Sequence, residues 1–138
     1  DDEIAAIMGH EIAHALREHA RERASEQATA GLLINAGAAG FGLGSSGADL
    51  GRLAYQTTFG LKHSRQHETE ADRIGVELAA RAGYDPRAAI TLWQKMAARS
   101  GGKSQPEFLS THPSASTRIK DLQDYSARVL PLYQEQGR

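Results

Sequence analysis

Two histidines and a glutamate near the start of the chain have the types and the spacing of a hydrolytic metal centre. His10 and His14 are four residues apart, so on an α-helix they lie on one face, about one turn from each other. Neutral imidazole nitrogen is a common zinc ligand, and catalytic zinc sites keep three protein ligands and one open position. Glu11 lies about 100° around the helix from His10, where it can act as general base on a water in that position. The pattern predicts one Zn²⁺ ion bound by His10 and His14, with Glu11 as a catalytic residue.

A third metal ligand must come from elsewhere in the chain. Segment 68–72 offers two carboxylates, Glu68 and Asp72, four residues apart on one helical face. Glu68 could bind the metal, while Asp72 accepts a hydrogen bond from the second ring N–H of a ligand histidine and fixes its tautomer. The alternative is a solvated acidic face without a metal role. Together with His10 and His14, the two carboxylates favour Glu68 as third ligand and Asp72 as its supporting residue.

The elements that position these residues are expected to be helices. Apolar residues recur at helical spacing, which predicts a mainly α fold with little or no β structure. The expected helices cover residues 2–27, 48–61, 63–82, 86–99 and a last segment that begins at Ser114 or Ser116 and ends or kinks at Pro131. Gly83 is expected to end one helix and Asp85-Pro86 to open the next.

Residues 28–47 differ from the rest of the chain because they carry no charge and are rich in glycine and alanine. Their apolar part is shorter than the roughly 20 residues of a membrane-spanning helix. We expect a short buried helix followed by a glycine loop near the active site. The alternative is a hairpin that touches or enters a membrane.

Composition limits the classes of protein that fit. A chain of 138 residues suits one small domain, so we expect a single catalytic domain over residues 1–138. The net charge of −1, with basic and acidic residues interspersed, gives no reason to expect a nucleic-acid partner. The chain has no cysteine, which excludes a disulfide framework and a thiolate metal site. The first residues do not show a signal segment, and the first helix starts only a few residues before His10. We therefore expect a catalytic-domain fragment that lacks upstream structure, or a mature form that has lost its upstream part.

Residues 10–14, taken with Ser-Arg-Gln-His-Glu-Thr-Glu-Ala-Asp at 64–72, resemble the HtpX/BepA family of gluzincin zinc metallopeptidases. This CAAX prenyl protease type 1/HtpX peptidase family also includes mitochondrial relatives. The resemblance covers nearly the whole chain, and segments 70–75 and 82–86 look closer to its soluble bacterial periplasmic branch. It implies a zincin-like catalytic core with an active-site helix and a glutamate helix, in which Glu68 is the third zinc ligand.

The resemblance also singles out His112 and Arg118. In the periplasmic branch a loop histidine can occupy the open metal position and hold the enzyme inactive, which would make His112 a fourth ligand. A peptidase also needs a donor for the oxyanion, and His112 or Arg118 is expected to supply it. The alternative for Thr111-His112-Pro113 is a turn that only starts a helix.

The remaining histidines are not expected to bind the metal. His19 lies five residues after His14, off the ligand face, and is predicted to be solvated. His67 is next to Glu68 and cannot share its face, and His63 shows no ligand pattern either. Trp93 fits the apolar stripe of its helix and is expected in the core.

The leading interpretation is a zinc endopeptidase that acts on protein or peptide substrates. The resemblance implies protein quality control in the bacterial periplasm or cell envelope, with outer-membrane or envelope assembly proteins as candidate partners. One alternative is a zinc-stabilised chaperone-like or scaffolding module with little proteolysis, against which Glu11 argues because a structural site would not require it. Another is a membrane-integrated protease with residues 28–47 in the bilayer.

Overall fold

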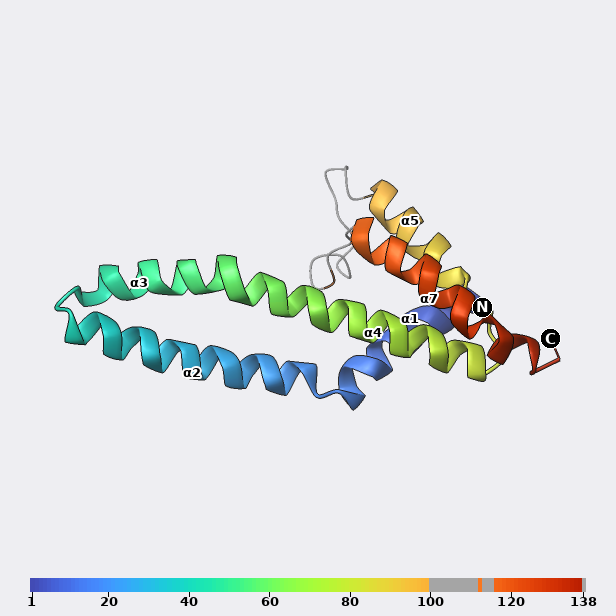
Figure 1. Cartoon of the computed structure of the whole chain (residues 1–138), viewed down its shortest axis with the longest axis horizontal. Coiled ribbons are helices and arrows are strands. Elements are labelled where there is room, and N and C mark those ends of the chain that lie inside the picture. Colours follow the sequence, from blue (N-terminus) through green and yellow to red (C-terminus); the bar gives the residue numbers. More distant parts are fainter. Residues whose placement is uncertain (100–111, 113–115, 138) are drawn as a thin grey trace. The chain divides into compact units, whose positions relative to one another are not determined.

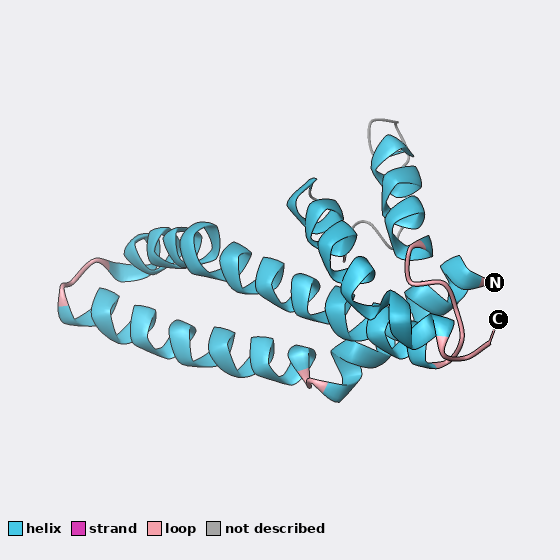
Figure 2. Cartoon of the chain, turned by 45° about the vertical axis from the view of Figure 1, so that its right-hand side comes forward, coloured by secondary structure: helices cyan, strands magenta, loops and turns pink. Residues whose placement is uncertain are grey.

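The computed structural model describes residues 1–99, 112 and 116–137, except for the side chain of His63. Every regular element among these residues is helical (Figure 1; Figure 2), so the predicted mainly α fold is confirmed. The chain divides into two compact units. Unit 1 consists of Asp1–Leu16 and Glu68–Arg138, and unit 2 of Arg17–His67. The single domain over residues 1–138 stays a prediction, and the two units are described separately.

Unit 1 contains α1 (Asp2–Leu16), most of α4 (Leu61–Arg81), α5 (Ala88–Arg99) and α7 (Ser116–Gln134). One cluster of buried side chains from all four helices forms its core: Ala6, Val76, Ala80, Ala89, Leu92, Trp93, Leu122 and Val129. Burial of such apolar surface is the main stabilising contribution in a small domain. The core therefore fixes α1 and α4, the two helices that carry the predicted metal ligands.

α1 and α4 approach each other at a pair of glycines. A Cβ atom on Gly9 would lie 2.5 Å from the carbonyl oxygen of Gly75, and a Cβ atom on Gly75 would lie 2.7 Å from the backbone nitrogen of His10. Real Cβ atoms essentially never come this close to backbone atoms, so neither position has room for a side chain. The two glycines let the helix that carries His10 lie directly against the helix that carries Glu68 and Asp72.

The helix ends of unit 1 follow the expected turn chemistry. α4 ends at Arg81, and Gly83 has a φ of 80°, the left-handed conformation that favours glycine after a helix. Asp85 accepts a hydrogen bond from the backbone N–H of Arg87 at 2.9 Å, just before α5. Pro131 lies inside α7, which continues to Gln134, so this proline does not end the helix.

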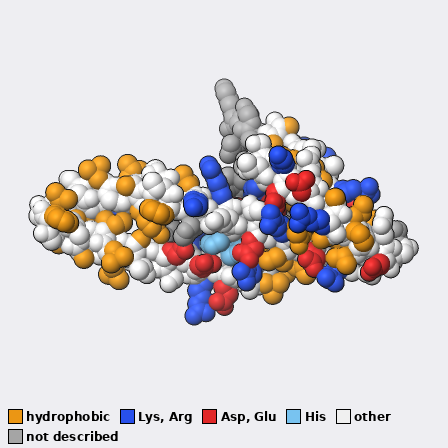
Figure 3. Space-filling model, in the orientation of Figure 1, with side chains coloured by type: hydrophobic (Ala, Val, Ile, Leu, Met, Phe, Trp, Pro, Cys, Tyr) orange, Lys and Arg blue, Asp and Glu red, His pale blue; other side chains and the backbone are white. Residues whose placement is uncertain are grey.

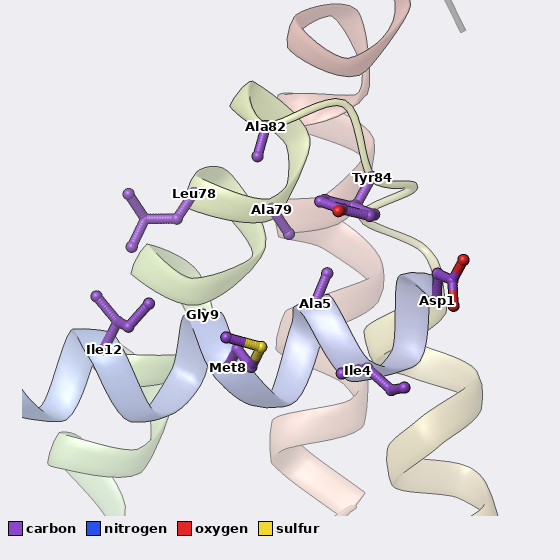
Figure 4. A pocket seen from close by; sticks show the side chains of 10 residues that line it. All are labelled: Asp1, Ile4, Ala5, Met8, Gly9, Ile12, Leu78, Ala79, Ala82 and Tyr84. Carbon is purple, nitrogen blue, oxygen red and sulfur yellow. The ribbon is translucent and has the colours of Figure 1, made fainter.

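The outer face of α1 carries apolar side chains. Ile4, Met8 and Ile12 are 61%, 59% and 47% exposed and line a groove beside the C-terminal part of α4 (Figure 4). Their spacing of four residues places them in one row, about half a turn away from His10 and His14. α1 thus has a ligand face toward the interior of unit 1 and an apolar face toward solvent.

The expected continuous helix over residues 2–27 is wrong. Glu18 has φ 51° and ψ 32°, and this left-handed residue separates α1 from α2 (His19–Gly40). The conformation costs an L-residue about 1–2 kcal/mol, and neither Arg17 nor Glu18 is a residue type that favours it. Helical periodicity continues across the break, which is why the sequence did not predict it.

Unit 2 is a helical hairpin followed by a π-helical turn. α2 and α3 (Gly44–Tyr55) run side by side and are joined at residues 41–43 (Figure 1), and η1 (Gln56–Gly60) leads into α4. The expected buried helix with a glycine loop is wrong, since α2 continues to Gly40 and both Leu32 and Leu33 are at least 70% exposed. In the described parts of the chain, no helix combines the length and the apolar character needed to span a bilayer.

Candidate metal centre

Four side chains from three segments of unit 1 converge on one point. They are His10 and His14 from α1, Glu68 from α4, and His112. Each contributes one ligand atom, and all four atoms lie within 4.8 Å of one another. His10 and Glu68 are buried, whereas His14 and His112 are partly exposed. The structure therefore brings together all three predicted ligands and the proposed fourth.

The spacing of the ligand atoms fits a tetrahedral metal ion. Nε2 of His10 lies 3.1 Å from Nε2 of His14 and 3.3 Å from Nδ1 of His112. The Glu68 carboxylate lies 3.1 Å from Nδ1 of His112 and 3.3 Å from Nε2 of His14. Tetrahedral zinc with bonds of about 2.0–2.1 Å places neighbouring ligand atoms roughly 3.3 Å apart. Three imidazoles and one carboxylate are also a donor set that zinc accepts, so the residues present fit the metal that the motif implies.

The surroundings of Glu68 keep its carboxylate ionised, which is the state in which a carboxylate binds a metal ion. Burial raises the pKa of its carboxyl, but hydrogen bonds with His10, His112 and His14 outweigh burial and hold that pKa well below its ordinary value. The charge of the nearby Arg118 acts in the same direction. The carboxylate is therefore ionised at neutral pH although its residue is only 2% exposed.

Asp72 lies behind His10, as predicted for a supporting carboxylate. Its Oδ1 is 2.9 Å from Nδ1 of His10, while Nε2 of the same ring faces the other ligands. A proton on Nδ1 leaves the lone pair of Nε2 free for a metal. Burial lowers the pKa of His10, but hydrogen bonds with Asp72 and Glu68 outweigh it, and the pKa is raised. Asp72 thus both orients the ring and increases its basicity.

Arg118 faces the two carboxylates. Its Nε and Nη2 each donate to Asp72 at 2.7 Å, and its Nη1 is 2.9 Å from Glu68. The residue is 3% exposed, and its guanidinium carbon lies 4.0 Å from the ring centroid of Trp93, within cation–π range. This placement favours a positioning role over the predicted oxyanion donor. Nothing in the sequence alone connected Trp93 with this site.

Glu11 lies beside the ligand cluster and not within it. Its side chain is 50% exposed, and its Oε1 is 3.3 Å from Nε2 of His112. His112 therefore presents Nδ1 to the ligand cluster and Nε2 to Glu11. Its sequence neighbours Thr111 and Pro113 lie outside the described residues.

The other histidines are separate from this cluster. The prediction of a solvated His19 is wrong, because His19 is 2% exposed and its ring stacks on that of His67, with centroids 4.3 Å apart. His67 also places Nε2 3.3 Å from Glu22. Both histidines belong to unit 2, and neither is among the four converging ligands. The side chain of His63 lies outside the described residues.

Sequence reasoning missed the glycine pair Gly9 and Gly75, which allows the two ligand helices to touch. The sequence does offer a signal for such a close contact, since an isolated glycine inside a helical pattern often has a packing reason. Gly9 directly precedes the first ligand, and Gly75 lies one turn after Asp72. Their pairing across two helices could not be read from either segment by itself.

Comparison with known proteins gives a consistent set of matches. The family model described as "Peptidase family M48" matches residues 1–126. The mitochondrial metalloendopeptidase OMA1 of Schizosaccharomyces pombe is 37% identical over 130 residues, which cover 91% of this chain and 36% of that protein. The mitochondrial metalloendopeptidase OMA1 of Bos taurus is 38% identical over 140 aligned positions, with 94% of this chain and 27% of that protein covered.

A bacterial relative has similar coverage. The beta-barrel assembly-enhancing protease of Escherichia coli K12 is 30% identical over 140 aligned positions, which cover 96% of this chain and 29% of that protein. The chain thus spans between about a quarter and two fifths of the length of the curated relatives that it matches. No solved structure shows significant similarity to it.

Proposed function

Because the chain belongs to peptidase family M48, we propose that it is a zinc endopeptidase with a single metal ion bound by His10, His14 and Glu68. The observation that carries this proposal is the convergence of these ligand atoms at tetrahedral spacing, with Glu11 beside them. Relatives named metalloendopeptidases support it.

The residues around the centre have separate tasks in peptide hydrolysis. A bound zinc ion supplies Lewis-acid chemistry, polarising the scissile carbonyl and acidifying water. Glu11 is accessible enough to take the proton of the attacking water and to pass it to the leaving amine. The Asp72 carboxylate, 2.9 Å from Nδ1 of His10, favours a proton on that nitrogen and thereby leaves Nε2 directed toward the ligand cluster. Arg118 holds both carboxylates in place from a buried position.

His112 is proposed to act as a latch in the resting enzyme. Its Nδ1 completes the set of four ligand atoms, and its Nε2 faces the Glu11 carboxylate. In this arrangement the fourth ligand position and the general base are both engaged by one side chain. Catalysis then requires His112 to move away, and from a nearby position the same ring could donate to the oxyanion.

The substrates are proposed to be proteins or peptides, as the peptidase family implies. A role in envelope quality control, with assembly proteins as partners, is supported by the Escherichia coli relative named for beta-barrel assembly. Other relatives are named mitochondrial. A periplasmic or envelope location is therefore proposed from the resemblance of residues 70–75 and 82–86 to the bacterial branch, and the narrower HtpX/CAAX type from the resemblance of residues 10–14 and 64–72.

The test compares the parent chain with the Glu11→Gln variant, both loaded with zinc, in metal analysis and casein cleavage. We expect equal zinc content and a loss of cleavage of at least about 10²-fold, the lower range of general-base catalysis. Glu135→Gln makes the same chemical change at an exposed position of the C-terminal segment and should leave both readouts unchanged. Retained turnover in zinc-loaded Glu11→Gln would remove Glu11 as the base. Absence of any cleavage by both the parent and the His112→Ala variant would contradict the endopeptidase.

A further inference from the structure

In the helical hairpin of unit 2, most large apolar side chains face outward instead of packing between the helices. Among the described residues of this unit, the buried apolar side chains are those of Ala38 and Ala48. Most of the large ones are more than half exposed, namely Leu32, Leu33, Phe41, Leu43, Leu50, Leu53, Phe59 and Leu61, whereas Ile34 and Tyr55 are partly exposed. A helix pair in water normally places its large apolar side chains between the helices and its small or polar ones outside. Apart from Ile34, which faces Gly51 of the other helix, the large apolar side chains of the α2–α3 hairpin do the opposite.

Small residues form the contact between the two helices. Ala38 of α2 and Ala48 of α3 are 7% and 6% exposed, and a Cβ atom on Gly51 would lie 2.8 Å from Cγ2 of Ile34. The helices can approach closely only because these positions are alanine and glycine. Small residues between helices, with large apolar side chains outside, are typical of helix pairs in lipid.

The outer part of the hairpin carries no charge. Residues 27–48 contain no Asp, Glu, Lys or Arg, and Figure 3 shows hydrophobic side chains over this part of α2 and α3. Leu32 and Leu33 lie just before Asn35, outside the outermost residues of the hairpin, and point about 100° apart, so the exposed apolar surface continues around α2 beyond its outer end. A protein partner would contact one side of the hairpin, whereas a bilayer surrounds an inserted element.

The charges of the chain are distributed unequally. Unit 2 contains six basic and four acidic residues, a net charge of +2, while unit 1 contains ten basic and thirteen acidic residues, a net charge of −3. An anionic bilayer surface would therefore attract unit 2 and repel unit 1.

A polar contact marks how far the hairpin could enter a bilayer. Arg52 donates to Asn35 at 2.6 Å and to Asp49 at 2.8 Å, which joins the two helices through charged and amide groups. The six residues from Asn35 to the end of α2 at Gly40 correspond to about 9 Å at 1.5 Å per residue. Interfacial elements bury their apolar part about 5–10 Å deep. The 14 residues from Gln27 to Gly40 correspond to about 21 Å, which is short of the roughly 30 Å hydrocarbon core.

We propose that the hairpin tip, defined as residues 36–48, inserts into one leaflet of a phospholipid bilayer. Phe41 and Leu43, 83% and 58% exposed at the turn, enter first, and the contact of Arg52 with Asn35 and Asp49 stays at the level of the headgroups. The inference does not depend on the proposed peptidase activity, because it concerns side chains of unit 2 that lie outside the metal centre.

The first experiment measures flotation of the 138-residue chain with vesicles of phosphatidylethanolamine and phosphatidylglycerol. We expect the parent to float, and the Phe41→Ser/Leu43→Ser variant to lose at least tenfold in partition coefficient. Ile4→Ser/Met8→Ser is the matched control, since these side chains are 61% and 59% exposed in unit 1, and it should float like the parent. No flotation of the parent, or equal flotation of both double variants, would overturn the proposal.

The second experiment locates the contact. Since the chain has no cysteine, a single environment-sensitive label can be attached through Leu43→Cys, with Met8→Cys as a control of equal exposure (58% and 59%). We expect a blue shift on vesicle addition for the label at position 43 and none at position 8. A response at position 8 alone, or at neither, contradicts insertion of the tip. A vesicle-independent shift at position 43, with a mass of twice 14.9 kDa, would show that a second chain covers the tip instead.

Discussion

Two imidazoles of the centre, those of His10 and His112, use their two nitrogens for different contacts. His10 directs Nε2 to the ligand cluster and Nδ1 to Asp72. His112 directs Nδ1 to the cluster and Nε2 to Glu11. An outer carboxylate therefore orients each of these rings, in the way that metal-bound histidines are commonly held. In the proposed mechanism Glu11 has a second use, because its contact with Nε2 of His112 would hold the latch in place before Glu11 serves as base.

Zinc affinities of variants should distinguish the proposed ligand role of Glu68 from the supporting role of Asp72. We expect Glu68→Ala to weaken zinc binding more strongly than Asp72→Asn, which should lose about 10–100-fold. The measurement is competition with a chromophoric chelator, and Asp124→Asn, an exposed position on α7, is the matched control. If Glu68→Ala bound zinc as tightly as the parent, the third ligand would have to be another residue.

The two roles considered for His112 predict opposite phenotypes. If His112 is a latch, the His112→Ala substitution should raise basal casein cleavage and self-cleavage, because the fourth ligand position and Glu11 become available. If His112 is instead an oxyanion donor, the same substitution should cost about 2–4 kcal/mol of transition-state stabilisation. We expect the increase, measured as initial cleavage rates at equal zinc content. A hundredfold decrease would exclude the latch and leave the donor role.

The residues that converge in the candidate centre could be singled out in advance, because their spacing has a geometric meaning. Residues four apart share a helical face, which connected His10 with His14 and Glu68 with Asp72 before any fold was known. His112 was found only through the resemblance, since a loop histidine has no periodicity. The contacts of Arg118 with Glu68 and Asp72 could not be predicted, because the partners of a buried cation depend on contacts between separate helices.

At the level of the elements, the crossing of α1 and α4 determines the centre. We expect Gly75→Ala to destabilise the fold by about 1–3 kcal/mol, the usual cost of overpacking, because its Cβ atom would lie 2.7 Å from the backbone of His10. Zinc affinity should fall as well, since His10 is displaced from Glu68. Urea unfolding and chelator competition measure the two effects.

The control for this substitution is Gly31→Ala in α2. No atom lies within 4 Å of a Cβ atom placed there, and alanine is favoured over glycine in a helix by about 1 kcal/mol. Gly31→Ala should therefore stabilise the chain slightly and leave zinc affinity unchanged. Equal stability of Gly75→Ala and the parent would show that the helices can separate without loss.

Helix positions were predictable to a useful degree, but not the places where helices break or meet. α4 and α5 occupy nearly the predicted residues because glycine, aspartate and proline mark their ends. The break at Glu18 was missed because the residues on both sides continue the helical pattern. The outward-facing leucines of the α2–α3 hairpin could not be predicted from periodicity, because a helix pair in water normally turns its large apolar side chains inward.

At the level of the whole molecule, metal removal should reverse the pH dependence of stability. Without metal, protonated His10 is favoured in the folded state, as its pKa is raised above 6.5 by Asp72 and Glu68. The stabilisation of the folded state by protonated His10 is fully present below about pH 6.5 and is lost as the pH rises through the raised pKa of His10. The free energy of unfolding of the metal-free chain should therefore fall above pH 6.5.

With zinc bound, the same window should show the opposite slope, because zinc binds neutral imidazole and protons compete with it. Urea unfolding at several pH values, with chelator or with zinc, gives both slopes. The metal-free His10→Asn variant should lack the downward slope attributed to His10. A metal-free parent that gains stability between pH 6.5 and 8.5 would contradict the contacts described for His10.

X-ray absorption at the zinc edge, combined with metal analysis, tests the central claim of a four-residue metal centre most directly. We predict one zinc ion per chain, with three imidazole nitrogens and one carboxylate oxygen at about 2.0–2.1 Å, from His10, His14, His112 and Glu68. Loss of one imidazole from this shell in His112→Ala, with zinc retained, would match the latch. A chain that binds no zinc, or binds it with fewer than two imidazoles, would contradict the centre.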